Sequence, residues 1–234
     1  MKRYESRFQA GKILVECIKI QNKKLGEDLI DNPDIFFCFA IPNGGVPVTE
    51  GFCSILKFKY DILIVRKIKI PFNPEAGFGS ITTDGTIFIN QPLLTRLNLS
   101  EESKIRSIEL TKAEIYDRLK FYEKTLDLEQ AYRKQIQNKY VFILDDGLAS
   151  GFTMIAAISM IKKYKPIKIF ITVPTAPLRT VNKLNKDVDE IFCPDIREVM
   201  QFAVADAYNH WYDVPESEVL EIINESNYYV NDIE

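Results

Sequence analysis

The sequence predicts an α/β protein: a mainly parallel five-stranded sheet with helices on both faces, plus a β-hairpin loop and a small hood. Three observations lead to this fold class. Short apolar runs are continuous rather than alternating, which is typical of strands covered on both faces. Segments with a helical period lie between most of these runs. The resulting alternation of strand and helix favours a parallel sheet with helical crossovers.

The first elements alternate as this class requires. Residues 6–24 place apolar side chains near one face of a helix. The run 35–41, "IFFCFAI", predicts a buried strand, and the breaker Pro42-Asn43-Gly44-Gly45 ends it. A helix is expected over 48–56, and "DILIVRK" over 61–67 predicts a second buried strand.

The middle of the chain departs from the alternation. Residues 71–79, "PFNPEAGFG", predict a loop because proline and glycine punctuate them. The following segment alternates around Asp84-Gly85, which indicates a hairpin. Residues 101–126 then predict a long charged helix with one apolar side.

The alternation returns in the second half. The run 140–146, "YVFILDD", predicts a third buried strand, and a helical pattern follows over 154–161. A fourth strand is expected at 167–173, a short helix at 177–184 and a fifth strand at 188–193. The whole of 1–234 is interpreted as a single domain.

Composition excludes several classes of protein. Hydrophobic residues make up 46% and charged residues 27%, without an apolar run long enough for a membrane span or a signal peptide. Four scattered cysteines without a CxxC pair indicate reduced thiols and predict a cytoplasmic protein. The single histidine argues against a histidine metal site. From residue 187 onward, thirteen acids face one base, which argues against nucleic-acid binding.

The strongest chemical signal is the pair Asp145 and Asp146, at the expected carboxyl end of the third strand. In a parallel sheet, ligands bind beyond that end. The loop after the acids leads into a helix N-terminus, whose free N–H groups favour a phosphate. Gly151 allows close approach, and Ser150 and Thr153 offer hydroxyls. A ribose diol on the acids with a 5′-phosphate on the loop fits this pattern, while magnesium ligands or helix caps are the alternatives.

The stretch "VFILDDGLASGFTM" resembles the 5-phosphoribosyl-1-pyrophosphate (PRPP) motif of type I phosphoribosyltransferases. The segments "YESRFQAGKILVE", "IPNGGVPV" and "VDEIFC" are similar to a subgroup of predicted prokaryotic phosphoribosyltransferases, and the likeness covers nearly the whole chain. Asn43 stands where many members carry arginine, so a positive charge expected near pyrophosphate is absent.

The resemblance implies a phosphoribosyltransferase that uses PRPP and Mg²⁺, transfers phosphoribose to a nitrogen acceptor, expected to be a nucleobase, and releases pyrophosphate. It implies that Asp145 and Asp146 bind the ribose, with Mg²⁺ held through PRPP near them rather than directly by protein ligands. The 5′-phosphate is expected on Gly147, Leu148, Ala149, Ser150, Gly151, Phe152 and Thr153.

The pyrophosphate is expected on the N–H groups of Asn43, Gly44 and Gly45, where the resemblance also implies a strained or cis peptide. Arg66 and Lys67, which end the predicted second strand, are the candidate catalytic cations, with a solvated strand end as the alternative.

Two further regions are expected around this site. Residues 69–90 occupy the place of the family's mobile catalytic loop, in which Glu75 could bind magnesium or transfer a proton, with an idle surface acid as the alternative. Residues 193–234 are expected to form a hood and tail, which with the N-terminal helix would select the acceptor. Trp211, Phe192 or Phe202 could stack on a base, with core packing as the alternative.

Two other functions stay open at this stage. A non-catalytic regulator that binds PRPP or a nucleotide would explain Asn43 and the lack of a clear proton-transfer residue. A hydrolase acting on a nucleotide is a third candidate. Membrane partners are not expected, and a homodimer is left open.

Overall fold

A computed structural model of the chain describes residues 3–124 and 128–230. In this part of the chain, a parallel five-stranded sheet has the order β2-β1-β6-β7-β9, which confirms the predicted fold class. Its strands are β1 (Phe36–Ala40), β2 (Tyr60–Ile62), β6 (Tyr140–Leu144), β7 (Lys168–Thr172) and β9 (Glu190–Phe192).

The sheet core is aromatic. Cys38 of β1 pairs with Phe142 of β6, which pairs in turn with Phe170 of β7. The rings of Phe142 and Phe170 lie 4.9 Å apart between centroids, and both side chains are buried. Burying each such side chain stabilises the fold by about 1.5–3 kcal/mol. The continuous apolar runs are therefore explained by burial on both faces.

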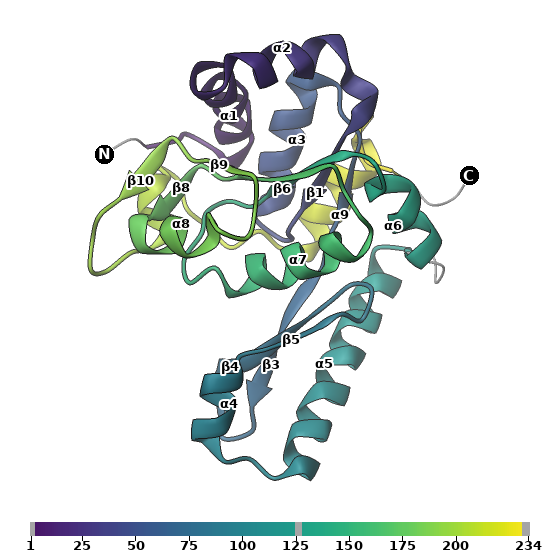
Figure 1. The fold of residues 1–234 in the computed structure, drawn as a ribbon, viewed down its shortest axis with the longest axis vertical. Helices are drawn as coiled ribbons and strands as arrows, with labels where there is room; N and C mark the ends of the chain where they lie inside the picture. Colours follow the sequence, from purple (N-terminus) through teal and green to yellow (C-terminus); the bar gives the residue numbers. More distant parts are fainter. Residues whose placement is uncertain (1–2, 125–127, 231–234) are drawn as a thin grey trace.

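Helices cover both faces of the sheet (Figure 1). On one side lie α1 (Arg7–Gln21), α2 (Lys23–Asp31) and α3 (Gly45–Leu56), and on the other lies α7 (Phe152–Lys163). Glycines let α1 and α3 approach closely, because a Cβ at Gly11 would lie 1.9 Å from the carbonyl oxygen of Val48. The remaining elements near this body are η1 (Pro33–Ile35), α6 (Leu128–Ile136), β8 (Thr175–Pro177), α8 (Leu178–Leu184), β10 (Asp195–Arg197), η2 (Val204–Ala207) and α9 (Glu216–Glu225).

A small lobe projects from one side of the sheet (Figure 1). It holds an antiparallel sheet of β3, β4 and β5, packed against a long helix. Its elements are β3 (Val65–Ile70), β4 (Asn73–Thr82), β5 (Ile87–Ile89), α4 (Gln91–Leu97) and α5 (Glu101–Phe121).

The lobe corrects two predictions from the sequence. Residues 61–67 do not form one strand, because the chain leaves the parallel sheet at Leu63 and Ile64. Leu63 N–H still donates to Ala40, at 2.8 Å, while Ile64 N–H donates to the Thr83 hydroxyl of the lobe, at 2.8 Å. All these side chains are buried, so an apolar run alone could not show the break.

Residues 71–79 are also not a loop, since most of them belong to β4. Glycine here serves close strand packing rather than chain reversal. A Cβ at Gly79 would lie 2.5 Å from the carbonyl oxygen of Phe88 on the neighbouring strand. The predicted hairpin around Asp84-Gly85 is confirmed by the antiparallel pairing of β4 with β5.

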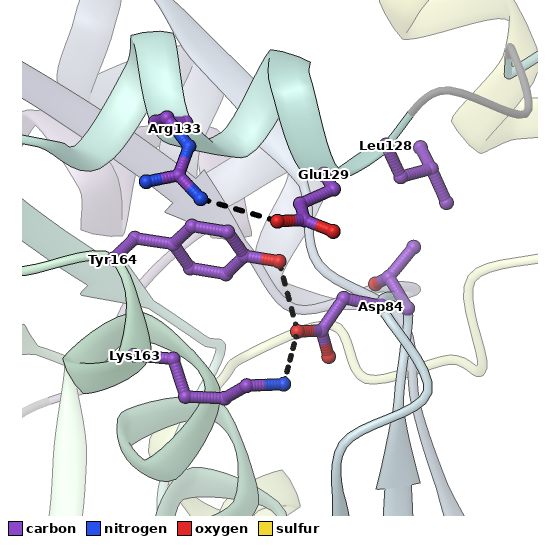
Figure 2. A pocket seen from close by; sticks show the side chains of 7 residues that line it. Asp84, Leu128, Glu129, Arg133, Lys163 and Tyr164 are labelled. Atoms are coloured by element: carbon purple, nitrogen blue, oxygen red, sulfur yellow. Dashed lines mark hydrogen bonds and ion pairs between the residues drawn. The ribbon is translucent and has the colours of Figure 1, made fainter.

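The hairpin tip is fastened to the end of α7. Asp84 accepts hydrogen bonds from the Lys163 ammonium and the Tyr164 hydroxyl, each at 3.0 Å (Figure 2). A cavity of about 370 Å³ opens beside these contacts, and Glu129 and Arg133 of α6 (Leu128–Ile136), which pair with each other at 3.1 Å, also line it (Figure 2). The predicted mobile segment, residues 69–90, therefore contains the strands β4 and β5, and the turn that joins them contacts the end of α7. The mobility of this segment stays a prediction.

Candidate functional site

Asp145 and Asp146 follow β6 at the carboxyl edge of the sheet, as predicted. Asp146 forms an ion pair with Arg7, the first residue of α1, with 2.9 Å between Nε and Oδ2. Both partners are largely shielded, with 5% of the Arg7 side chain and 15% of the Asp146 side chain exposed. The N–H group of Asp146 donates to Oδ1 of Asp145 at 2.8 Å. The acids are thus packed together, with one cation beside them.

This packing disfavours two negative charges. Burial and the charge of Asp146 raise the pKa of Asp145 well above the ordinary carboxyl value. Burial also raises the pKa of Asp146, although the guanidinium of Arg7 opposes the shift. Titratable groups perturbed in this way are typical of functional sites, because a fold gains no stability from such a pair.

The predicted pyrophosphate loop lies directly against the acids. A Cβ at Gly44 would be 1.9 Å from Oδ2 of Asp146, and one at Gly45 would be 2.8 Å from the carbonyl oxygen of Leu144. Any side chain at these two positions would collide with the acid loop, so glycine is required for the contact. The peptide bond between Pro42 and Asn43 is cis, as the resemblance implies.

Asn43 is held by both of its amide ends. Its Nδ2 donates to the carbonyl oxygen of Val214 at 2.8 Å, and its Oδ1 accepts from Nη1 of Arg118 at 3.0 Å. Arg118 comes from α5 and also pairs with Glu216 at 2.5 Å. The expectation that this loop lacks a nearby positive charge is therefore wrong, because Arg118 supplies one from another part of the chain.

Arg7 lies in an aromatic cage formed by the segment after η2. Its guanidinium carbon is 4.2 Å from the ring centroid of Trp211, 5.3 Å from that of Tyr212 and 5.4 Å from that of Tyr208. The Tyr208 hydroxyl donates to the backbone oxygen of Asp146 at 2.7 Å. The cage therefore connects the predicted hood to Asp146 through Tyr208 and Arg7. Trp211 stacks on Arg7 in this structure.

The N-terminus joins the same region. Tyr4 N–H donates to the carbonyl oxygen of Ala207 at 2.8 Å, and Asn209 N–H donates to the carbonyl oxygen of Tyr4 at 2.9 Å. The N-terminal segment and residues 204–212 therefore meet, and their role as a hood that selects the acceptor stays a prediction. Phe192 is fully buried in the core, which fits the packing alternative.

The predicted phosphate loop has an exposed centre and a buried start. Gly147 and Leu148 are buried, and the Leu148 N–H group already donates to the carbonyl oxygen of Thr175 at 3.0 Å. Ala149 and Ser150 are exposed. Gly151 has a φ of 75°, in the left-handed region that favours glycine.

The helix after this loop has Gly151 at its N-cap position, which has no side chain to cap it. Among the described residues, no side-chain hydrogen bond caps the N-terminus of α7, where Phe152 and Thr153 are the first residues. The N–H groups of a helix's first turn lack partners within the helix and attract anions. The predicted 5′-phosphate loop therefore has the required donors, although the Leu148 N–H group is not one of them.

Arg66 and Lys67 are not at the end of a parallel strand. They are the second and third residues of β3 in the lobe, where they pair with Ile81 and Ser80. Arg66 is half-buried and Lys67 is exposed. Their proposed catalytic role stays a prediction. The side chain of Glu75 lies outside the described part of the structure, and with it the prediction for that residue.

The described residues offer little as a direct metal site. No three His, Cys, Asp or Glu side chains among them come together in a group that could hold a metal ion. The carboxylates of Asp145 and Asp146 are hard oxygen donors that suit Mg²⁺. A magnesium ion here would need further oxygen ligands from a bound substrate.

Sequence reasoning missed Arg7 and Arg118. A signal for Arg7 was present, because it shares the buried face of α1 with Ala10, Gly11 and Leu14, at spacings of three, four and seven. A cation on an apolar helix face needs a buried partner. Arg118 had no comparable signal in its charged helix.

Comparisons with known proteins identify the family of the chain. A family model described as phosphoribosyl transferase domain matches residues 6–207. Two curated proteins of Mycobacterium tuberculosis, each named "Putative phosphoribosyl transferase", are 26% identical over 229 residues, which is 97% of this chain and 48% of theirs. The chain thus spans about half the length of the curated relatives it matches.

The fold also has a solved counterpart. The crystal structure of the protein TT1426 from Thermus thermophilus matches with a TM-score of 0.68 at 22% identity, over 94% of this chain and 97% of that one. This likeness concerns the fold. None of the described helices combines the length and apolar character that a membrane span requires.

Proposed function

The chain belongs to the phosphoribosyl transferase domain family, and from that premise we propose that it transfers phosphoribose from PRPP to a nitrogen acceptor, a nucleobase. The C1–oxygen bond to pyrophosphate breaks, and its electron pair leaves with pyrophosphate. The acceptor nitrogen forms the new bond to C1 with its lone pair and then loses a proton to water.

One observation carries the proposal. The shielded acids Asp145 and Asp146 stand between a glycine loop, which packs on them, and an uncapped helix N-terminus. PRPP has a ribose diol with the pyrophosphate on one side and the 5′-phosphate on the other. This arrangement matches two carboxylate acceptors that lie between two sets of backbone N–H donors. Carboxylates accept from vicinal hydroxyls, and backbone N–H groups bind the phosphates.

Each end of PRPP has proposed partners. The 5′-phosphate binds at Gly151, Phe152 and Thr153 on the N-terminus of α7. The pyrophosphate binds at Asn43, Gly44 and Gly45, and its proposed cationic partners are Arg66 and Lys67, which belong to β3. Cations and N–H groups aimed at the leaving anion favour bond breaking, since negative charge develops there.

Magnesium is part of the proposal. Mg²⁺ bound together with PRPP would neutralise the charge of the diphosphate group, and Asp145 and Asp146 would offer carboxylate oxygens near it. Burial raises the pKa of both acids, and a nearby divalent cation would oppose this shift and favour their ionised forms.

The test is pyrophosphate release from PRPP and Mg²⁺ across a panel of purine and pyrimidine bases. Release that depends on one base supports the transferase. Release without any base supports a hydrolase, and tight PRPP binding without release supports a regulator. Absence of PRPP binding at millimolar concentration rejects the proposal. The control is Asp117→Asn, an exposed acid on α5, which should match the wild type.

One observation favours the regulator as a second candidate. Arg7 already pairs with Asp146, and Arg118 with Glu216, so the charges of the site are balanced before any ligand binds.

A further inference from the structure

A cavity of about 540 Å³ lies beside the proposed 5′-phosphate loop. Pockets of a few hundred cubic ångströms hold small-molecule ligands. Two residues of the loop form one wall, and α8 forms the other. The lining residues are Ala149, Ser150, Arg179, Thr180, Lys183 and Phe202.

The helix α8 is fixed directly against the loop. The Thr180 hydroxyl donates to the carbonyl oxygen of Ala149 at 2.6 Å. A Cβ at Gly151 would lie 2.9 Å from the methyl group of Thr180 and 3.2 Å from a methyl carbon of Leu184. The exposed residues of the phosphate loop, Ala149 and Ser150, therefore line one side of the cavity, and side chains of α8 line the other.

Two cations line this cavity without a carboxylate partner. Arg179 donates from Nη1 to the carbonyl oxygens of Met200 and Val199, at 2.8 and 3.4 Å. Lys183 lies four residues further along α8, on the same face of the helix, and its Nζ is 4.3 Å from the ring centroid of Phe152. Within the described ranges, neither cation forms a salt bridge and no lining residue is acidic.

Lys183 lies close to the phosphate loop, because Phe152 is the first residue of α7. An anionic group that extends beyond the first phosphate would meet two uncompensated cations there. A monophosphate would be held by the N–H groups of the α7 N-terminus and would leave these cations unused.

We propose that this cavity binds the second phosphate of a nucleoside 5′-diphosphate whose first phosphate lies on the α7 N-terminus. The inference rests on the proposed function, which places the 5′-phosphate on that loop. It adds a ligand class, since PRPP carries only one phosphate at C5. A nucleoside diphosphate bound in this way would occupy the ribose site and compete with PRPP.

The test is calorimetric titration of the full chain with the 5′-mono- and diphosphates of adenosine, guanosine, cytidine and uridine. For at least one nucleoside, the diphosphate should bind about fivefold more tightly than the monophosphate, as expected of exposed charge contacts. Arg179→Ala and Lys183→Ala should each reduce this gain, and the double variant should abolish it. Arg179→Lys should retain much of it, because the charge remains.

The matched control is Lys186→Ala, which removes an exposed lysine just after α8 that does not line the cavity. It should keep the full gain. Equal affinity of mono- and diphosphates in the wild type, no measurable diphosphate binding at millimolar concentration, or a gain that survives in the double variant would each overturn the inference.

A parallel titration with PRPP separates the two proposals. If PRPP binds but the nucleoside diphosphates bind no more tightly than the monophosphates, the cavity inference is rejected and the proposed function stands. A charge-dependent diphosphate gain without PRPP binding rejects the proposed function, while the cavity inference survives on the nucleotide titrations.

Discussion

Replacing Asp145 by Asn is expected to stabilise the folded chain and to weaken PRPP binding. Burial and the charge of Asp146 raise the pKa of Asp145, so the folded chain disfavours a second negative charge beside Asp146. An amide in place of Asp145 has a similar shape and cannot ionise. Its oxygen can still accept from the Asp146 N–H group, a contact of 2.8 Å in the wild type.

The size of the gain follows from charge repulsion. Two unit charges about 4 Å apart repel by about 4 kcal/mol when the effective dielectric constant is about 20. Arg7, 2.9 Å from Asp146, offsets much of this repulsion. We therefore expect the free energy of unfolding to rise by about 1–2 kcal/mol, as for other substitutions that relieve a strained site. That corresponds to about 2–8 °C in melting temperature for a chain of this size.

The gain should depend on pH in one direction. Because burial and the charge of Asp146 make the folded state hold the Asp145 proton more tightly than the unfolded chain does, wild-type stability falls as pH rises from the ordinary carboxyl pKa towards the raised pKa of Asp145. The variant lacks this loss, so its advantage grows over that window and then levels off.

The assay is thermal denaturation over a pH series that starts near the ordinary carboxyl pKa, about 4, and rises from there. It is repeated with PRPP, whose stabilising effect should be smaller in the variant. Asp117→Asn is the matched control, since Asp117 is exposed on α5 and should show no gain. An advantage of Asp145→Asn that is the same at every pH, or a variant less stable than the wild type at pH 8, would refute the reasoning.

Three further changes test other contacts. Arg7→Met leaves Asp146 shielded and unpaired, so urea denaturation should show that the free energy of unfolding falls by about 3 kcal/mol. Arg7→Lys should restore little of this stability, since only a planar guanidinium stacks on Trp211. Arg118→Gln should weaken PRPP binding about tenfold in calorimetry, which is about 1.4 kcal/mol, and should leave the affinity for a nucleoside monophosphate unchanged. An equal loss of affinity for both ligands would contradict the position of Arg118 at the pyrophosphate end. Burial alone would raise the pKa of Asp84, but hydrogen bonds from neighbouring groups lower it below the ordinary carboxyl value. The ionised Asp84 therefore stabilises the fold above the ordinary carboxyl pKa, and this stabilisation is lost as pH falls through the lowered pKa. Asp84→Ala should therefore remove that pH dependence and speed amide exchange across 79–89, and unchanged exchange would show that the tip contacts do not hold the hairpin.

The parallel sheet could be predicted because its signals are local. Each strand, such as β6, is a continuous apolar run, and burial on both faces requires one. The break at Leu63 and Ile64 could not be predicted, because a buried chain that changes sheets has the same composition as one that continues. Glycines at 77 and 79 gave a misleading signal, because they serve close strand packing there and not a loop.

The acids of the site were found for the same reason, and its cations were missed. Asp145 and Asp146 adjoin a strand in sequence, so their position at the sheet edge follows from local pattern. Arg7 lies 139 positions from Asp146, and Arg118 lies 75 positions from Asn43. Contacts over such separations depend on how α1 and α5 pack, which no periodicity in one helix specifies.

These distant cations change how affinity at the site must be interpreted. If the ribose hydroxyls donate to Asp146, they compete with Arg7 for the same carboxylate. The aromatic cage can hold the guanidinium when it moves off, because Trp211 lies 4.2 Å from it. At the other end, Arg118 can reach a pyrophosphate only by loosening its pair with Glu216. A measured affinity for PRPP is therefore the difference between the contacts that form and the internal pairs that they replace.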